Sequence, residues 1–282
     1  MNIVLVCITN FQEYILSNIE QLIKLNHKNI YILTNNNLFI HFSKYEHLIK
    51  LINIDDLIDT YNFYSNTYLD KSFRNGFWTL ASLRFFYIYE FMKKYEINDV
   101  IHLENDVLIY YNCDILIDKL DKNNIYLPFD SFNRNIASIM YIPTASIFKL
   151  VLDNYDMTKN DMENFSIIKQ KIGLINNFPI FNNQQSLNSE ISFVSTNFDK
   201  FNYIFDAAAI GQYLGGVDPQ NDQSNTVGFV NETCIIKYNI YEIYWFNVDN
   251  IIRPFITIDN NAIPIFNLHI HCKNLFKFIS FI

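Results

Sequence analysis

Short apolar runs, each followed by polar residues, divide the first third of the chain. Residues 3–8 and 29–33 form two such runs, and buried strands of a parallel sheet have this pattern. Between them, residues 12–25 repeat apolar side chains at helical spacing, which predicts an amphipathic helix. The order strand, helix, strand predicts a right-handed βαβ unit with parallel strands, and therefore an α/β fold.

The polar residues behind these strands mark the expected binding edge. Ligands of open α/β sheets bind beyond the carboxyl ends of the strands. Thr9 and Asn10 follow the first strand and Asn35 follows the second, so we expect all three at that edge. The first turn lacks the GxGxxG pattern, so the fingerprint of dinucleotide-binding folds is absent.

The rest of the chain continues the alternation of strands and helices. Apolar residues at helical spacing predict a helix over residues 77–95. No repeat, linker or low-complexity tract interrupts the pattern, so we expect one domain over residues 1–282. Further strands are expected over residues 48–54, 125–129, 137–142, 191–194, 203–205, 241–248, 255–258 and 263–271, and further helices over residues 146–155 and 206–214, with a helix start in 182–187.

Residues 100–111, VIHLENDVLIYY, are the stretch on which the functional prediction depends. Two apolar runs enclose Glu104, Asn105 and Asp106, so two carboxylates would stand at the end of a buried strand. Partial desolvation of a carboxylate costs free energy unless a cation or a hydrogen-bond donor pairs with it. A divalent metal held together with nucleotide phosphates is one answer. A simple turn between two strands is the other interpretation, since Asn and Asp are turn formers.

A second constellation stands in the last part of the sequence. His269 and His271 alternate within an apolar run, so on a strand both rings would point to one face. A single buried histidine is more often a core residue than a ligand, but two on one face with Lys273 just beyond favour a site. A carboxylate with an imidazole suits Mn²⁺ better than Mg²⁺, and Lys273 would neutralise phosphate as a point charge.

Two arginines and a glycine-rich segment supply further candidates. Arg74 and Arg84 would contact a phosphate or a base at the binding edge. Alternatively, Arg84 would pair with a structural carboxylate, because its helix face is otherwise apolar. Asp206 and Asp218 flank glycines that include Gly215, and a carboxylate there would take a proton from a sugar hydroxyl. A helix N-cap is the alternative role of Asp206.

Composition narrows the classes of partner. The 282 residues are 50% hydrophobic, which is ample for a large core, and the formal net charge is −8. No Lys/Arg cluster is present, which disfavours nucleic acid. The four cysteines are scattered without a CxxC pair, so neither a zinc site nor a disulfide framework is expected. No apolar run is long enough for a transmembrane segment, and the expected location is the cytoplasm.

In order, these features resemble the GT-A-fold, nucleotide-sugar-dependent glycosyltransferases. The match covers most of the chain: a βαβ start, an Arg-bearing helix, the ExD triplet after an apolar strand, an Asn/Gln-rich segment, and HxHxK near the end. It is most similar to the group of glycogenin and bacterial galactosyltransferases, and to glycosyltransferase-like proteins of large DNA viruses. Abundant Asn, Ile, Lys and Tyr, which have AT-rich codons, fit the viral proteins, for which host cytoplasm or the virion would be the location. The resemblance implies a GT-A-like, single Rossmann-like domain with a mixed, mostly parallel sheet flanked by helices.

The resemblance also implies roles for individual residues. Asp106 would be the main metal ligand, completed by His269 or His271, and Glu104 would reach the metal through water or hold the ribose. Lys273 would bind the diphosphate. The remaining expected donor contacts are Thr9, Asn10, Asn35, Arg74, Arg84, Asn105, Gln184 and Gly215.

The chain departs from the family pattern at two places. The Asp-Gln motif over the donor sugar falls at Asn183 and Gln184, where Asn replaces Asp. The HxxGxxKPW ending is reduced to HIHCK. Retention or inversion at the sugar therefore stays open.

The expected function is metal-dependent transfer of a hexose-type sugar from a nucleotide-sugar donor, with UDP as the expected nucleotide, to a hydroxyl of a glycan or protein acceptor. Mn²⁺ or Mg²⁺ would be the cofactor, and Asp206, ahead of Asp218, would take the acceptor proton if the reaction inverts. Residues 1–111 would bind the nucleotide, and residues 112–282 would bind the acceptor and complete the metal site. A non-catalytic nucleotide-sugar or glycan-binding protein and an interaction protein with aromatic surfaces are the alternatives, and the sequence leaves a homodimer open.

Overall fold

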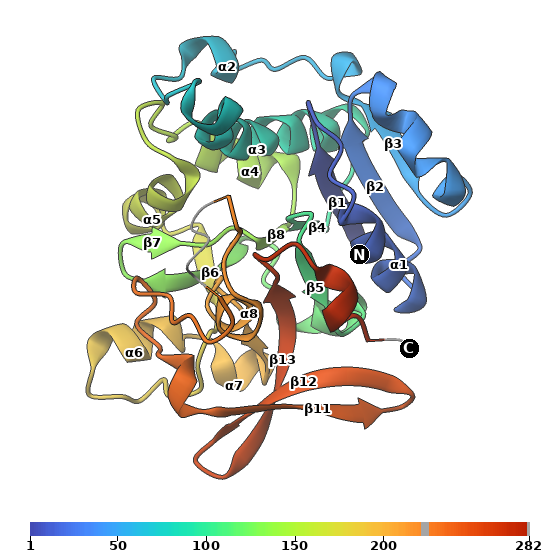
Figure 1. Ribbon diagram of the computed structural model, residues 1–282. Coiled ribbons are helices and arrows are strands. Elements are labelled where there is room, and N and C mark those ends of the chain that lie inside the picture. The colour runs from blue at the N-terminus through green and yellow to red at the C-terminus, as the bar shows by residue number, and fades with distance from the viewer. Residues whose placement is uncertain (221–225, 281–282) are drawn as a thin grey trace.

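A large mixed sheet forms the centre of the computed structural model, which describes residues 1–220 and 226–280 (Figure 1). In these residues it has eight strands: β1 (Asn2–Cys7), β2 (Asn29–Thr34), β3 (Lys50–Asn53), β4 (Val100–Leu103), β6 (Ile125–Ser131), β7 (Arg134–Asn135), β8 (Ile139–Ile142) and β9 (Ile175–Phe178). Their order is β3-β2-β1-β4-β8-β6-β7, with β9 beside β6. The first four are parallel, β8 is antiparallel to its neighbours, and β9 is parallel to β6. The predicted α/β class with a mixed, mostly parallel sheet is confirmed.

The centre of this sheet contains a topological switch point. Val4 of β1 pairs with Tyr31 of β2 on one side and with His102 of β4 on the other. From β1 the chain moves outward through β2 and β3, and it then returns to place β4 against the free side of β1. Open α/β sheets bind ligands beyond the carboxyl ends of strands at such a point. The residues that follow β1 and β4 are therefore the expected location of a site.

Helices cover both faces of the sheet because neighbouring residues of a strand point to opposite sides. Ile3 packs into one apolar cluster with α1, whereas Val4 packs into another with α3. The helices are α1 (Ile15–Lys24), α2 (Phe63–Asn66), α3 (Phe77–Lys94), α4 (Ala145–Leu152), α5 (Asp161–Ile172), α6 (Ser189–Val194), α7 (Phe198–Phe201) and α8 (Ile210–Gly215). Among the described residues, none of the helices has the length and apolar character that a membrane span requires.

A second, smaller sheet holds the last strands. It comprises β5 (Val107–Ile109), β10 (Ile204–Phe205), β11 (Glu242–Val248), β12 (Ile251–Ile258) and β13 (Asn261–His269). β13 runs antiparallel to β5, with His269 opposite Val107. Figure 1 shows β13 rising from the β11–β12 hairpin to lie beside β5. This pairing brings His269 to the turn that follows β4.

Two of the predicted elements are wrong, and others have different bounds, among them the helix expected over residues 206–214, which begins at Ile210. Residues 182–187 do not start a helix; α6 begins at Ser189, where the Asn188 side chain caps the first N–H groups. The strand expected over residues 191–194 is part of α6. The strand expected to continue to residue 271 ends at His269, because the His271 N–H turns back to the His269 carbonyl at 3.1 Å.

Candidate functional site

The turn between β4 and β5 carries Glu104, Asn105 and Asp106. The Val107 N–H closes it by donating to the Glu104 carbonyl at 3.0 Å. The buried Asn105 side chain donates to the Val6 carbonyl of β1 at 2.8 Å. The structure therefore shows Asn105 tying the turn to β1, and its expected nucleotide contact has no support in this geometry.

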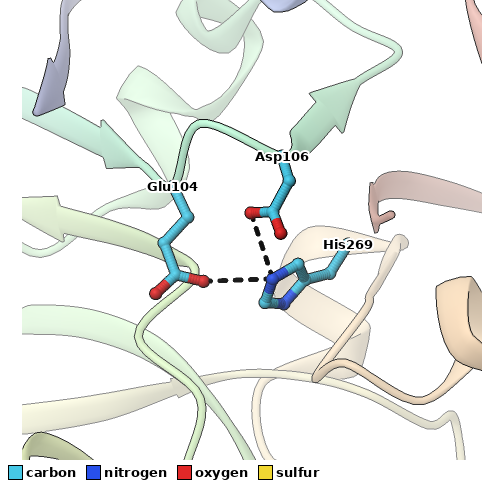
Figure 2. A group of neighbouring side chains, drawn as sticks. All are labelled: Glu104, Asp106 and His269. Atoms are coloured by element: carbon cyan, nitrogen blue, oxygen red, sulfur yellow. Dashed lines mark ion pairs between the residues drawn. The ribbon is translucent and has the colours of Figure 1, made fainter. Parts of the chain in front are cut away.

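Two carboxylates and one imidazole converge at this turn (Figure 2). His269 Nε2 lies 3.1 Å from Glu104 Oε2 and 3.2 Å from Asp106 Oδ1. One ligand atom from each of the three residues lies within 4.8 Å of the others. Asp106 and His269 are buried, whereas the Glu104 side chain is partly exposed. The cluster is thus buried on the side of Asp106 and His269 and partly exposed to solvent on the side of Glu104.

Opposite charges hold the cluster together. Burial raises the pKa of Asp106, but Lys273 and His269 more than offset this and hold that pKa well below its usual value. Burial lowers the pKa of His269, but Asp106 and then Glu104 raise it above its usual value. Each group therefore favours the charged form of its neighbour, as expected for charges packed out of water.

Lys273 places an ammonium group beside the cluster. Its ammonium donates to Asp106 Oδ2 and lies 5.4 Å from the centre of the Tyr14 ring. Burial lowers the pKa of Lys273, but Asp106, and with smaller effect Asp218 and Glu104, raise it above its usual value. A cavity of about 320 Å³ adjoins this side chain, lined by Glu13, Tyr14, Ser17, Lys273, Asn274, Leu275 and Phe276.

His271 lies beside the cluster without joining it. Its ring centre is 4.1 Å from that of His269, but within the described residues neither carboxylate of the cluster forms an ion pair with it. Burial, followed by the charge of His269, lowers the pKa of His271 well below its usual value. Its buried Nε2 has no hydrogen-bond partner among the described residues. The geometry favours His269 over His271 as the histidine of a metal site.

Arg84 reaches the cluster from helix α3. Its Nη1 lies 2.5 Å from Glu104 Oε1, and its Nη2 lies 3.1 Å from Asp161 Oδ2. The arginine is therefore the partner of structural carboxylates, which is one of the two roles that the sequence left open. It orients Glu104 and does not present its guanidinium to the open side.

Asp206 lies four residues before α8, whose N-cap position is Ala209, and it holds the first N–H groups of that helix from outside it. It has no exposed surface. Its Oδ1 accepts the N–H groups of Ala209 and Ile210, and its Oδ2 accepts those of Gly211 and His269, all between 2.8 and 2.9 Å. A carboxylate that is buried and accepts four N–H groups is poorly placed to contact an acceptor hydroxyl, so this geometry does not favour the expected catalytic role of Asp206.

Two glycines allow α8 to approach the end of the chain closely. A Cβ on Gly211 would lie 2.0 Å from the His269 carbonyl oxygen, so no other residue fits there without a shift. A Cβ on Gly215 would meet Cys272 Sγ at 3.1 Å. Gly215 is thus a packing residue against Cys272, and the structure does not place it at the triad of Glu104, Asp106 and His269.

The remaining sequence candidates lie around the rim. Asp218 follows α8 and accepts the Gln220 N–H at 2.8 Å, and its charge helps to raise the pKa of Lys273. Arg74 has a left-handed backbone (φ +49°) and donates to the Gln220 carbonyl. The loop that holds Asp218 is therefore linked to the segment before α3.

At the end of β1, Asn35 Oδ1 accepts the Thr9 N–H at 2.8 Å, which brings these two predicted residues together. Asn10 is exposed beside them. Gln184 lies in the irregular segment before α6, and no hydrogen bond within the described residues joins its side chain to the triad. Thr9, Asn10 and Asn35 therefore lie at the predicted binding edge, at the carboxyl ends of β1 and β2. Gln184 lies elsewhere, in the segment before α6.

The residues of the cluster fit a divalent cation. Carboxylate oxygens are the ligands that Mg²⁺ and Mn²⁺ prefer, and an imidazole shifts the preference toward Mn²⁺. His269 already directs one ring nitrogen at both carboxylates. Glu104, Asp106 and His269 would hold the ion, so Glu104 has a more direct place than the sequence assigned to it.

Tyr14 and Asp161 are two residues of the site region that the sequence did not single out. Tyr14 lies four residues beyond Asn10, and its pKa is raised first by burial and then by Asp106. Asp161 is a buried carboxylate on α5, distant in sequence from its partner Arg84. The position of Tyr14 after the first strand was a usable signal, whereas the partner of Asp161 depends on tertiary packing alone.

No family model matches the chain, and no curated protein matches it. Similar solved structures include mouse xyloside xylosyltransferase 1, with a TM-score of 0.44 and 10% identity over 63% of this chain and 84% of that one. The glycosyltransferase GlyE of Streptococcus pneumoniae has a TM-score of 0.40 and 14% identity over 65% of this chain and 45% of its own. A cytidylyltransferase from Leptospira borgpetersenii has a TM-score of 0.38 and 10% identity over 63% of this chain and 75% of its own. TM-scores below 0.5 are too low to assign a family, so the function must be inferred from the site.

Proposed function

We propose that the chain is a metal-dependent glycosyltransferase that moves a hexose-type sugar from a nucleoside diphosphate to an acceptor hydroxyl. The convergence of Glu104, Asp106 and His269 at the switch point of the sheet is the observation that carries the proposal. A divalent ion there, with Lys273 beside it, suits a diphosphate. The cation is Mn²⁺ or Mg²⁺, and UDP is the expected nucleotide.

The proposed reaction breaks the bond between the anomeric carbon and the diphosphate oxygen. The bonding electrons pass to the diphosphate, and the acceptor oxygen forms the new bond to the anomeric carbon. A bound divalent cation supplies positive charge to the leaving diphosphate. Lys273, which stands 5.4 Å from the Tyr14 ring beside the cavity, adds a second charge that binds and orients the same group.

Asp218 is the carboxylate to which we assign the acceptor proton if the reaction inverts. Asp218 is partly exposed, and its charge helps to raise the pKa of Lys273. Both oxygens of Asp206, in contrast, already accept backbone N–H groups. In this proposal residues 1–111 supply the nucleotide side, and residues 112–282 supply the acceptor side and His269.

A non-catalytic nucleotide-sugar-binding protein is the second candidate. The observation that favours it is the full occupation of Asp206 by backbone N–H groups, which removes the carboxylate first expected to act as base. Such a protein would bind UDP-sugars with Mn²⁺ but would neither transfer nor hydrolyse them.

A thermal-shift screen of UDP-sugars with and without Mn²⁺, followed by a hydrolysis assay on each binder, tests the proposal. We expect a rise in melting temperature that requires both components, because a ligand that binds the folded state stabilises it by mass action. Release of free sugar would identify an enzyme, and binding without release would identify the second candidate. The absence of any Mn²⁺-dependent shift would overturn both.

A further inference from the structure

A chain of alternating basic and acidic side chains extends from the candidate metal cluster into the core. From the open side inward it passes through Lys273, Asp106, His269, Glu104 and Arg84. It ends at Asp161, which is 3.1 Å from Arg84 and almost fully buried. Within the described residues Asp161 forms no ion pair with Glu104, Asp106 or His269, and its contact with the cluster is through Arg84.

Asp161 is held firmly in this place. It is the first residue of α5, whose start is capped by the Asn160 side chain. The Asn135 amide donates to the Asp161 carbonyl at 3.0 Å and also to the Met162 carbonyl, which ties the beginning of the helix to β7. A carboxylate on such a fixed backbone is a firm anchor for a long arginine side chain.

The two ends of the Arg84 guanidinium are shared between two acids. Nη1 faces Glu104 Oε1, and Nη2 faces Asp161 Oδ2. This leaves Glu104 Oε2 directed at His269, at 3.1 Å, where an ion would lie. Guanidinium groups prefer to bind both oxygens of one carboxylate when they can. Without Asp161, Arg84 would be free to take both oxygens of Glu104.

We propose that Asp161 is a positioning residue that keeps one oxygen of Glu104 available for the divalent cation. It does so by engaging the second arm of Arg84, so that Arg84 orients Glu104 without covering it. The role rests on the proposed function for its metal-binding consequence, but the arrangement of Arg84 and Glu104 can be tested without any metal.

The test compares Asp161→Asn with Glu104→Gln and the double variant in Mn²⁺ binding by isothermal calorimetry. We expect Asp161→Asn to weaken Mn²⁺ binding about tenfold in the wild-type background but less than twofold in the Glu104→Gln background. Residues that act through one another show such non-additive effects. Equal losses in both backgrounds, or no loss in either, would overturn the proposal.

Glu90→Gln is the matched control. Glu90 is also buried, lies on the same helix as Arg84, and pairs with Lys93 and the Thr60 N–H. It should lower the melting temperature as Asp161→Asn does but leave Mn²⁺ affinity within twofold. A matching loss of Mn²⁺ affinity in this control would show that the effect of Asp161 is merely structural.

Crystal structures of wild type and Asp161→Asn give a readout that does not need metal binding. We expect Arg84 to contact both oxygens of Glu104 in the variant, and His269 to lose its contact with Glu104. If Glu104 keeps its wild-type orientation, the positioning role is overturned. If wild type binds no Mn²⁺ but Glu104 turns in the variant, the proposed function and the metal-binding consequence fail, and only the orientation of Glu104 by Asp161 through Arg84 stands.

Discussion

Asp106 and Asp206 are both buried acids in loops that follow a strand, but the groups that neutralise them differ. Asp106 faces the side chains of Lys273 and His269, which lower its pKa against the effect of burial. Asp206 faces four backbone N–H groups, and burial raises its pKa despite them. Side chains can exchange one partner for another, whereas backbone groups in a folded chain cannot. The first acid is thus suited to binding and the second to holding structure.

The two acids meet at one residue. His269 directs its ring at Asp106 and donates its backbone N–H to Asp206 at 2.9 Å. The capping acid therefore fixes the backbone of the residue whose ring completes the candidate metal site. Substitution of Asp206 should change mainly the stability of the fold, and substitution of Asp106 should change mainly the affinity for metal.

Removal of the structural acid should have the largest effect. Asp206→Ala leaves four buried N–H groups without their acceptor, and each such loss costs about 1–3 kcal/mol before relaxation. We expect the free energy of unfolding to fall by on the order of 4 kcal/mol, and the melting temperature by roughly 10 °C. Urea unfolding and a thermal scan would measure this. If the free energy of unfolding falls by less than about 1 kcal/mol, the structural role assigned to Asp206 is contradicted.

Asp106→Asn should show the reverse behaviour. It removes the charge between Lys273 and His269 and keeps the shape, so we expect Mn²⁺ affinity to fall at least 100-fold, roughly 2.7 kcal/mol. The melting temperature should change far less than in Asp206→Ala, because the partly exposed Lys273 can turn to water. Calorimetry and thermal scans on both variants would measure this, and unchanged Mn²⁺ affinity would be the contradicting result.

Lys273→Met should weaken the binding of UDP at the Asp106 site more than the binding of Mn²⁺. Charge-assisted hydrogen bonds to phosphate contribute about 1.5–3 kcal/mol, so we expect UDP affinity in the presence of Mn²⁺ to fall about tenfold or more. Lys277→Met, which removes an exposed lysine nearby, is the control and should leave UDP affinity unchanged. Equal effects of the two variants would argue against a diphosphate contact by Lys273.

The smallest effect expected is in the pH dependence of stability. The folded pKa of Asp106 lies below its unfolded value, so its stabilising contribution is present above the unfolded pKa, near 3.8, and is lost as the pH falls through the folded pKa. The folded pKa of Asp206 is raised, so its ionisation costs stability as the pH rises above 3.8. The difference in the free energy of unfolding between wild type and Asp106→Asn, measured by urea unfolding between pH 7 and pH 3, should therefore shrink once the pH falls below about 3.8. A difference that stays constant would contradict the assignment for Asp106.

The sequence was sufficient to predict the sheet and the meeting of the two key segments. Apolar runs with polar ends predicted β1, β2 and β4 because strands buried on both faces must be continuously apolar. The ExD triplet predicted its cationic partners because two desolvated carboxylates need them, and His269 and Lys273 lie at the triplet. Charge balance is thus a constraint that can be read before the fold is known.

The roles of Asp206 and Arg84 could not be separated in the same way. An acid before a helix is typical of both a cap and a base, and only the docking of β13 supplies the His269 N–H that completes the cap. Arg84 had two open interpretations until α5 placed Asp161 against it. The error at His271 has a local cause, since the Ile270 N–H bonds to the Asp106 carbonyl and the strand ends there.

The pairing of β13 with β5 makes the site dependent on the completion of folding. Asp106 and Lys273 are 167 positions apart in the chain, and contacts of such long range are established late because loop closure is entropically costly. A metal ion that needs both segments would bind only molecules in which β13 has docked, and it would stabilise those molecules selectively. During refolding, the amount of bound Mn²⁺ would then measure the fraction of chains in which β13 has paired with β5.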